Sequence, residues 1–101
     1  MEIFSRLISS PIPVVVICYA NWCSSCRNVS SVLYQIKTYH GDDIRVIKID
    51  VDKNRELVLN YSIQSVPTIL IFKDGKQLWR QTGSISSNEL NKIIELFKLN
   101  R

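Results

Sequence analysis

Residues 14–27 read VVVICYANWCSSCR, a continuous apolar run followed at once by two cysteines that are separated by two residues. The run from Val14 to Tyr19 is short and rich in β-branched side chains, which is typical of a central strand buried on both faces. Apolar residues then recur at helical spacing and predict a helix from Ser24 to about Tyr39. On this prediction, Cys23 and Cys26 lie where a buried strand meets the beginning of a helix.

The patterns around this stretch predict the rest of an α/β domain. Residues 44–51 read as a second strand, which a helical connection would make parallel to the first. Asp74-Gly75 between two apolar runs is a strong hairpin signal. The other expected features are a helix at 3–8 before Pro11 and Pro13, a helix stop at Gly41 and Asp42, a short helix capped by Asn54, hairpin strands at 68–73 and 77–81, and a final helix behind a capping box of Ser86 and Glu89. This order predicts a four-stranded mixed sheet with helices on both faces.

The composition limits the classes of function. The chain has 101 residues, which suits a single domain over 1–101. Its formal net charge of +4 comes from basic residues spread along the sequence, which argues against a nucleic-acid or membrane surface. The 3 cysteines are too few for a disulfide-stapled scaffold, and the N-terminus shows no secretory signal. We therefore expect a cytoplasmic protein, in which a close cysteine pair is more often catalytic or metal-binding than structural.

The place of the cysteine pair has a chemical consequence. A thiolate at the N-terminus of a helix is stabilised by free backbone N–H groups and by the helix dipole. We therefore expect the pKa of Cys23 to lie below the usual value of about 8.5. Cys23 precedes the predicted helix and should be exposed, whereas Cys26 lies within its first turn and should be shielded. The spacing also allows the two sulfurs to close an intramolecular disulfide.

Several segments together resemble the thioredoxin family. They are Trp22-Cys23-x-x-Cys26 after the buried strand, Lys48-Ile49-Asp50-Val51-Asp52, Ser65-Val66-Pro67-Thr68 at the start of a strand, Phe72-Lys73-Asp74-Gly75-Lys76, and Gly83 before the last helix. A lone Cys-x-x-Cys motif is weak evidence, but the same motif with these partners, in this order over nearly the whole chain, is specific. The resemblance implies a thioredoxin-like fold and a thiol–disulfide oxidoreductase that reduces protein disulfides.

The resemblance also implies roles for single residues. Cys23 corresponds to the attacking nucleophile and Cys26 to the resolving thiol, so these two would form the catalytic pair and its redox disulfide. Pro67 corresponds to the family's cis-proline, and the Val66 backbone would pair with an extended substrate strand. The expected substrate-binding rim consists of Trp22, Val66, Pro67 and Gly83. We expect no cofactor or metal, a monomer, disulfide-containing client proteins, and a thioredoxin-reductase-type electron donor.

Some features depart from the family pattern. Ile17 stands where the family has a buried aspartate, and Ser24-Ser25 replaces the usual Gly-Pro between the cysteines. Ser31 replaces a proline that often kinks the following helix. The first strand of full-length thioredoxins is missing, because the helix at 3–8 begins almost at Met1. These differences bear on rate and redox potential rather than on the class of reaction.

Alternatives remain at this level. A structural zinc site needs four ligands, and the other candidates are Cys18, inside an apolar strand, and His40, at a helix end. We expect Cys18 to be a small buried apolar residue and His40 an ordinary helix-end residue.

The alternative functions are disulfide oxidation or isomerisation, and a non-catalytic thioredoxin-like binding module. Retention of both cysteines and of Pro67 argues against the binding module.

Overall fold

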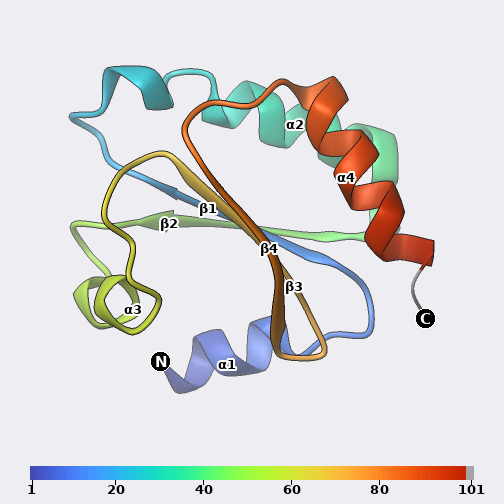
Figure 1. Ribbon diagram of the computed structural model, residues 1–101, viewed down its shortest axis with the longest axis horizontal. Coiled ribbons are helices and arrows are strands. Elements are labelled where there is room, and N and C mark those ends of the chain that lie inside the picture. The colour runs from blue at the N-terminus through green and yellow to red at the C-terminus, as the bar shows by residue number, and fades with distance from the viewer. Residues whose placement is uncertain (100–101) are drawn as a thin grey trace.

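The sheet in the computed structural model, which describes residues 1–99, has four strands in the order β2-β1-β3-β4 (Figure 1). The strands are β1 (Val14–Tyr19), β2 (Arg45–Asp50), β3 (Thr68–Lys73) and β4 (Lys76–Thr82). β1 pairs in parallel with β2 and antiparallel with β3, and β3 pairs antiparallel with β4. The predicted four-stranded mixed sheet is therefore confirmed.

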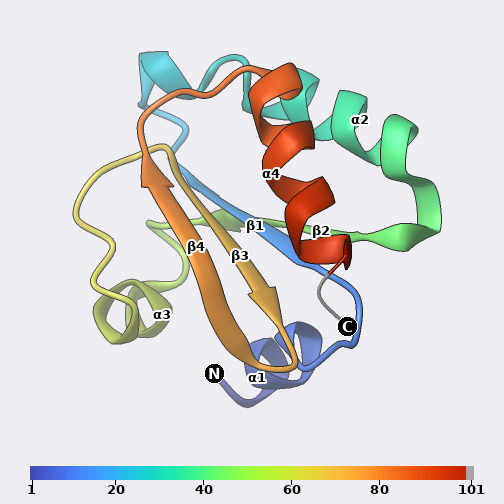
Figure 2. The same ribbon diagram turned by 45° about the vertical axis from the view of Figure 1, so that its right-hand side comes forward.

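Helices cover both faces of this sheet (Figure 2). The pair on one face is α2 (Val29–His40) and α4 (Ser87–Leu99), and the pair on the other is α1 (Glu2–Ile8) and α3 (Arg55–Asn60). Short 3₁₀ turns, Ser24–Cys26 and Gly41–Asp43, lie on either side of α2. The chain thus leaves the end of β1, makes the cysteine turn, and enters the α2–α4 layer.

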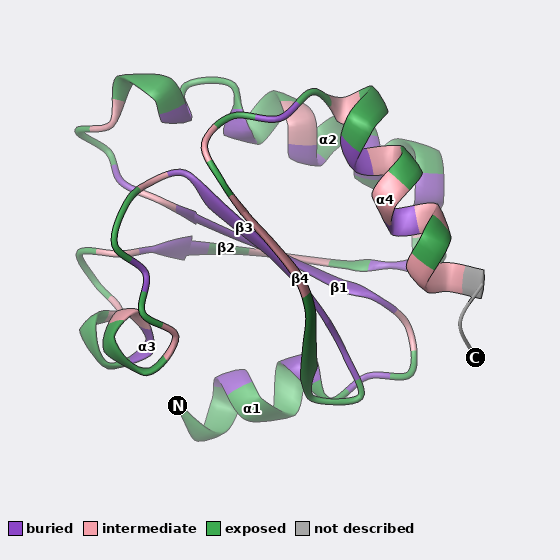
Figure 3. Ribbon diagram, viewed as in Figure 1, coloured by how far each residue is buried: buried purple, intermediate pink, exposed green. Residues whose placement is uncertain are grey.

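The side chains of β1 divide the core between the two faces, because successive residues of a strand point in opposite directions. Val15 and Ile17 pack with residues of α2 and α4, whereas Val14, Val16 and Cys18 pack with residues of α1 and α3. Each of these side chains is at most 1% exposed. Figure 3 shows β1 as a buried band through the centre of the molecule. This double burial explains why the sequence shows a continuous apolar run here instead of an alternation.

The helix predicted from Ser24 to about Tyr39 is divided in the structure, so the prediction of one continuous helix is wrong. Ser24–Cys26 is a 3₁₀ turn, closed by backbone hydrogen bonds between residues three apart. α-Helical bonding starts further along, and α2 begins at Val29. The helix ends at His40, one residue beyond the prediction, where Gly41 takes a φ of +57°. Glycine adopts this positive-φ conformation with little steric penalty, which makes it a suitable stop.

The predicted cap of the short helix α3 is wrong in its chemistry. Asn54 occupies the N-cap position, but its side chain makes no cap hydrogen bond to the helix. Its amide instead donates to the carbonyl oxygen of Asp50 at 2.8 Å. The Asp50 carboxylate accepts the N–H of Asp52 at 2.9 Å, so both side chains stabilise the turn between β2 and α3.

Two local signals in the sequence are confirmed. Asp74 and Gly75 take φ values of +53° and +80°, as a tight hairpin between β3 and β4 requires. Ser86 accepts the N–H of Glu89 at 3.1 Å, and its hydroxyl donates to the Glu89 carboxylate at 3.1 Å. The Ser86 half of the capping box is therefore formed at the beginning of α4, while the Glu89 carboxylate accepts from the Ser86 hydroxyl instead of its backbone N–H. The buried Leu90 of this helix faces the sheet.

The structure corrects the prediction that His40 is an ordinary helix-end residue. Its side chain is 0% exposed and links the end of α2 to α4. Nε2 lies 3.1 Å from Oδ1 of Asn91, and Nδ1 lies 3.1 Å from Nζ of Lys98. Because an ammonium group only donates, Nδ1 accepts from Lys98 and Nε2–H donates to Asn91. His40 is therefore held as a neutral imidazole between the two helices.

This burial predicts a dependence of stability on pH. Burial and then the Lys98 ammonium lower the pKa of His40. The stabilisation by neutral His40 is therefore complete above the unfolded-state pKa of about 6.5, and is lost as the pH falls through the lower folded-state pKa. We expect the free energy of unfolding to fall by up to about 1.4 kcal/mol per pH unit in that range.

Urea unfolding between about pH 8 and 5 measures this effect in the wild type and in His40→Gln. The chain has a single histidine, so the substitution removes every imidazole titration. The wild type should lose more stability than the variant as the pH falls. An equal loss of unfolding free energy in the two proteins would show that His40 is not responsible for the destabilisation at acidic pH.

Candidate active site

Cys23 and Cys26 form a disulfide at the end of the sheet where β1 gives way to the 3₁₀ turn. Their Cα atoms lie 5.3 Å apart. Cys26 is 8% exposed and belongs to the core cluster that contains Ile17 and Val29. Cys23 is half-buried and lies at the edge of that cluster. The structure therefore shields Cys26, as the sequence predicts. Cys23 is the more accessible of the two residues, but it is half-buried rather than exposed.

The surroundings of Cys23 differ from those expected at the N-terminus of a long helix. Cys23 precedes the 3₁₀ turn, whereas α2 begins six positions later at Val29. Two polar oxygen atoms lie near its sulfur. The hydroxyl oxygen of Ser25 lies 3.3 Å from the Cys23 Sγ, and the carbonyl oxygen of Val66 lies 3.6 Å from it. The immediate electrostatics of Cys23 therefore depend on these two oxygens.

The loop before β3 brings the expected rim residues next to the disulfide. The Val66–Pro67 peptide bond is cis, as the family resemblance implies for Pro67. Val66 is half-buried and places its carbonyl group beside Cys23. The N–H of Gly83 donates to the Pro67 carbonyl oxygen at 2.8 Å, so the loop before α4 lies against the same segment. Gly83 has a φ of +98°, which favours glycine at this position.

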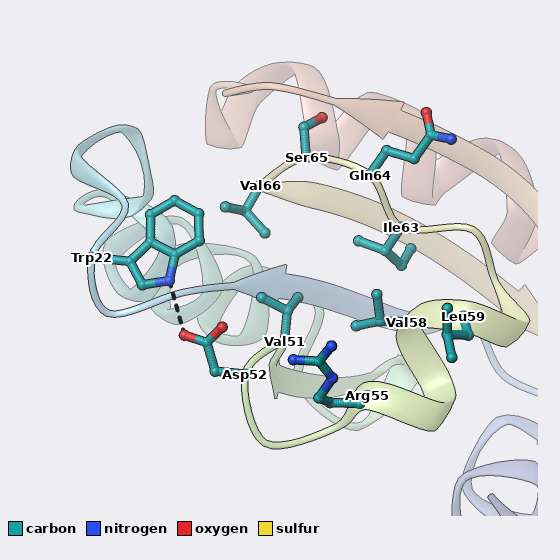
Figure 4. Close-up of a pocket in the computed structure, with 10 residues that line it drawn as sticks. All are labelled: Trp22, Val51, Asp52, Arg55, Val58, Leu59, Ile63, Gln64, Ser65 and Val66. Atoms are coloured by element: carbon teal, nitrogen blue, oxygen red, sulfur yellow. Dashed lines mark hydrogen bonds between the residues drawn. The ribbon is translucent and has the colours of Figure 1, made fainter.

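Trp22 directly precedes Cys23 and is 70% exposed. Its indole N–H donates to the Asp52 carboxylate at 2.9 Å, as Figure 4 shows. The hydrogen bond links this large apolar ring to the turn after β2. Asp52 belongs to the 48–52 motif in the sequence. Its hydrogen bond with Trp22 does not follow from that motif and is seen only in the structure.

A mainly apolar groove of about 230 Å³ continues from Trp22 and Val66 towards α3 (Figure 4). Its other lining residues are Val51, Asp52, Arg55, Val58, Leu59, Ile63, Gln64 and Ser65. Leu59 is 78% exposed, although leucine usually avoids solvent. The sequence does not reveal this groove, because most of its walls come from the turn after β2, from α3 and from the loop before β3, and only Trp22 comes from the motif around the cysteines.

The family's buried carboxylate has no equivalent at Ile17. This side chain is 1% exposed in the core cluster that contains Cys26, and an aliphatic group accepts no proton. Lys48 is the register partner of Ile17 on β2. It is exposed, donates to the Ser30 hydroxyl at 3.1 Å, and lies 4.5 Å from the ring centroid of Tyr19. Lys48 is therefore solvated and packed on an aromatic face.

The third cysteine is separate from this site. Cys18 is 0% exposed and lies in the core cluster on the opposite face of the sheet from Cys26. Burial raises the pKa of its thiol to about 11, and the Arg80 guanidinium opposes this only in part. Cys18 is a neutral, buried side chain, as predicted.

Within residues 1–99, no group of three or more His, Cys, Asp and Glu side chains is placed to hold a metal ion. None of the helices in that range is long and apolar enough to cross a membrane.

A mixed sheet between two helical layers, with a cysteine pair beside a cis-proline at its end, defines a thiol–disulfide oxidoreductase. The sequence model of the family described as Thioredoxin matches residues 1–96. Thioredoxin 1 of Synechococcus elongatus is 34% identical over 90 residues, which cover 89% of this chain and 84% of that protein. Thioredoxin of Mycobacterium tuberculosis is 41% identical over 78 residues, 77% of this chain and 67% of that protein.

Solved structures agree with these sequence relatives. The N21Q mutant thioredoxin from Halobacterium salinarum superimposes with a TM-score of 0.86 at 30% identity, covering 97% of this chain and 85% of that one. Thioredoxin-2, a component of the malaria parasite protein secretion machinery, superimposes with a TM-score of 0.81 at 33% identity, covering 84% of this chain and 82% of that one. The chain belongs to the thioredoxin family, and it is a thiol–disulfide oxidoreductase with protein-disulfide reductase activity.

Proposed function

We propose that the protein acts in the cytoplasm as a monomer that reduces disulfides of client proteins, with Cys23 as nucleophile and Cys26 as resolving thiol. A thioredoxin-reductase-type donor would return the pair to the dithiol. The observation that carries the proposal is the unequal exposure of the two sulfurs, with Cys26 at 8% and Cys23 half-buried at the rim. An intermolecular attack needs the accessible sulfur, and an intramolecular one needs only its neighbour.

The reaction proceeds in two exchanges. The Cys23 thiolate attacks one sulfur of the client disulfide, forms a mixed disulfide, and releases the first client thiolate. Cys26 then loses its proton and attacks the Cys23 sulfur, which closes the Cys23–Cys26 disulfide and releases the second client thiolate. Two electrons pass from the cysteine pair to the client, and the two client thiolates take up protons.

The same geometry supports a binding mode for the client. An extended client segment would pair with the backbone of Val66 and pass Pro67 and Gly83. An apolar side chain close to the client cysteine would enter the groove between Trp22 and Leu59, because the groove is lined by Val66, whose carbonyl oxygen lies 3.6 Å from the Cys23 sulfur. Burying that side chain contributes affinity without requiring a fixed client sequence.

Reduction of insulin with dithiothreitol as electron source, followed by turbidity, tests the proposal. The wild type should accelerate precipitation of the insulin B chain, and Cys23→Ser should give the uncatalysed rate. An inactive wild type would leave a non-catalytic binding module. Oxidation of a reduced client by the disulfide form, at a rate above that of insulin reduction, would favour the oxidase alternative.

The groove is tested in the same assay with Leu59→Asp. A carboxylate at this exposed position should raise the KM for insulin about fivefold, which corresponds to roughly 1 kcal/mol of lost apolar contact, with little change in kcat. Asn60→Asp is the matched control, since Asn60 is also exposed on α3 and does not line the groove. Equal effects of the two substitutions would remove the groove from the client-binding surface.

A further inference from the structure

We propose that Ser25 is a third catalytic side chain, whose hydroxyl donates a hydrogen bond to the Cys23 sulfur and stabilises it as the attacking thiolate. The inference rests on the proposed function, because it assigns a second group to the nucleophile. It also gives a role to the Ser24-Ser25 dipeptide, which stands where the family usually has Gly-Pro.

The geometry distinguishes the two serines. The Ser25 Oγ lies 3.3 Å from the Cys23 Sγ, within hydrogen-bond distance of a large sulfur atom. The sulfur is part of the disulfide and carries no hydrogen, so the hydroxyl is the donor. Ser24 is also exposed, but its hydroxyl has no hydrogen-bond partner among the described residues 1–99. The two side chains therefore form a matched pair, of which one touches the reacting atom.

Ser25 is held in place from its backbone. It is the middle residue of the 3₁₀ turn Ser24–Cys26, in which the N–H of Cys26 donates to the Cys23 carbonyl oxygen at 3.2 Å. The Ser84 hydroxyl donates to the Ser25 carbonyl oxygen at 3.4 Å. The loop before α4 thus contacts both the cysteine turn and the Val66–Pro67 segment. Such support limits the positions that the Ser25 hydroxyl can take relative to the sulfur.

The Val66 carbonyl oxygen has the opposite effect on Cys23. It lies 3.6 Å from the sulfur and can only accept a hydrogen bond, so it favours the thiol, which can donate, over the thiolate, which cannot. The Ser25 hydroxyl offsets this carbonyl with a donor at a shorter distance. Without the Ser25 hydroxyl, the Val66 carbonyl oxygen would be the remaining polar neighbour of the sulfur, and the thiol would become more stable relative to the thiolate.

The hydrogen bond also acts on the redox equilibrium. A donor interacts more strongly with an ionised sulfur than with a neutral disulfide sulfur. The exchange is disulfide plus two glutathiones giving dithiol plus glutathione disulfide. In the dithiol the Cys23 thiol can lose its proton to solvent, and the donor stabilises the thiolate that results. Ser25 should therefore move the equilibrium of the protein towards the dithiol.

The thiolate is measured by its ultraviolet absorbance during a pH titration of the full chain carrying Cys26→Ala. Cys18 does not interfere, because its pKa is raised to about 11. Adding Ser25→Ala should raise the titration midpoint by about one pH unit, a tenfold loss of thiolate below the midpoint. Ser24→Ala should leave the midpoint unchanged, and Ser25→Thr, which keeps a hydroxyl, should restore it.

The redox equilibrium is measured with the intact cysteine pair in glutathione buffers. Ser25→Ala should shift the constant about tenfold towards the disulfide, which corresponds to about 30 mV. Near-UV circular dichroism of each variant monitors the fold. Unchanged values for Ser25→Ala, or equal shifts for Ser24→Ala and Ser25→Ala, would overturn the inference. Such a result in a wild type that still reduces insulin through Cys23 would leave the proposed function intact.

Discussion

Cys26→Ser should convert the protein into a trap that binds client proteins covalently and does not release them. The accessible Cys23 can still attack a client disulfide, but no second thiol is available to break the mixed disulfide. We expect turnover to fall on the order of 10³-fold or more in both Cys26→Ser and Cys23→Ser, since each removes a reacting sulfur. Only Cys26→Ser should accumulate the covalent complex.

Intact-mass spectrometry after mixing each variant with oxidised insulin separates the two outcomes. Cys18→Ala serves as the control, because Cys18 is 0% exposed on the other face of the sheet and should not enter the exchange. Iodoacetamide should label Cys23 ahead of Cys26 in the reduced wild type. A complex formed by Cys23→Ser, or equal labelling of the two thiols, would reverse the assignment of their roles.

Ile17→Asp should accelerate the release of clients and lower the stability of the fold. Cys26 is shielded in an apolar cluster that includes Ile17, and burial disfavours a thiolate. In the wild type we therefore expect resolution of the mixed disulfide to limit turnover and to quicken as the pH rises. A carboxylate at residue 17 could take the Cys26 proton, so resolution near neutral pH should become faster and depend less on pH.

The same substitution places a carboxyl group where the side chain is 1% exposed. An unpartnered buried polar group should lower the free energy of unfolding by roughly 2 to 5 kcal/mol. Lys48 is the register partner on β2, and it would reduce this loss if it exchanged its Ser30 contact for the new carboxylate.

Stopped-flow decay of a preformed Cys23 mixed disulfide, followed across pH, measures the rate of resolution. Ile17→Asn is the matched variant, because it introduces a polar group of the same size that takes no proton. Only Ile17→Asp should be faster than the wild type. A wild type that resolves at a fast, pH-independent rate would show that Cys26 already has a proton acceptor.

The features that were predictable from the sequence depend on local patterns. The bounds of β1 follow from a doubly buried β-branched run, and the turn at Asp74-Gly75 follows from the chemistry of its two residues. The cysteine turn is separate from α2 because its backbone hydrogen bonds join residues three apart, as in a 3₁₀ helix. The helical spacing of apolar residues does not reveal this difference. The burial of His40 depends on α4, which lies about fifty positions further along the chain.

In the candidate site, too, some features were predictable from the sequence and others depend on tertiary structure. The cysteine pair and Pro67 were predictable because their spacing resembles a family motif. The groove was not, since its walls come from the turn after β2, from α3 and from the loop before β3, and their approach to Trp22 is a tertiary property. The hydrogen bond from Trp22 to Asp52, thirty residues apart, is of the same kind.

The strand order leaves β2 and β4 as the two edges of the sheet. Exposed edges present unpaired backbone groups, which can template the addition of a strand from another molecule. Arg45 and Lys48 lie exposed on β2, and Lys76 lies exposed at the start of β4. Two copies approaching edge to edge would bring like charges together and would have to desolvate them. The positive charges along both borders therefore oppose edge-to-edge aggregation of the sheet.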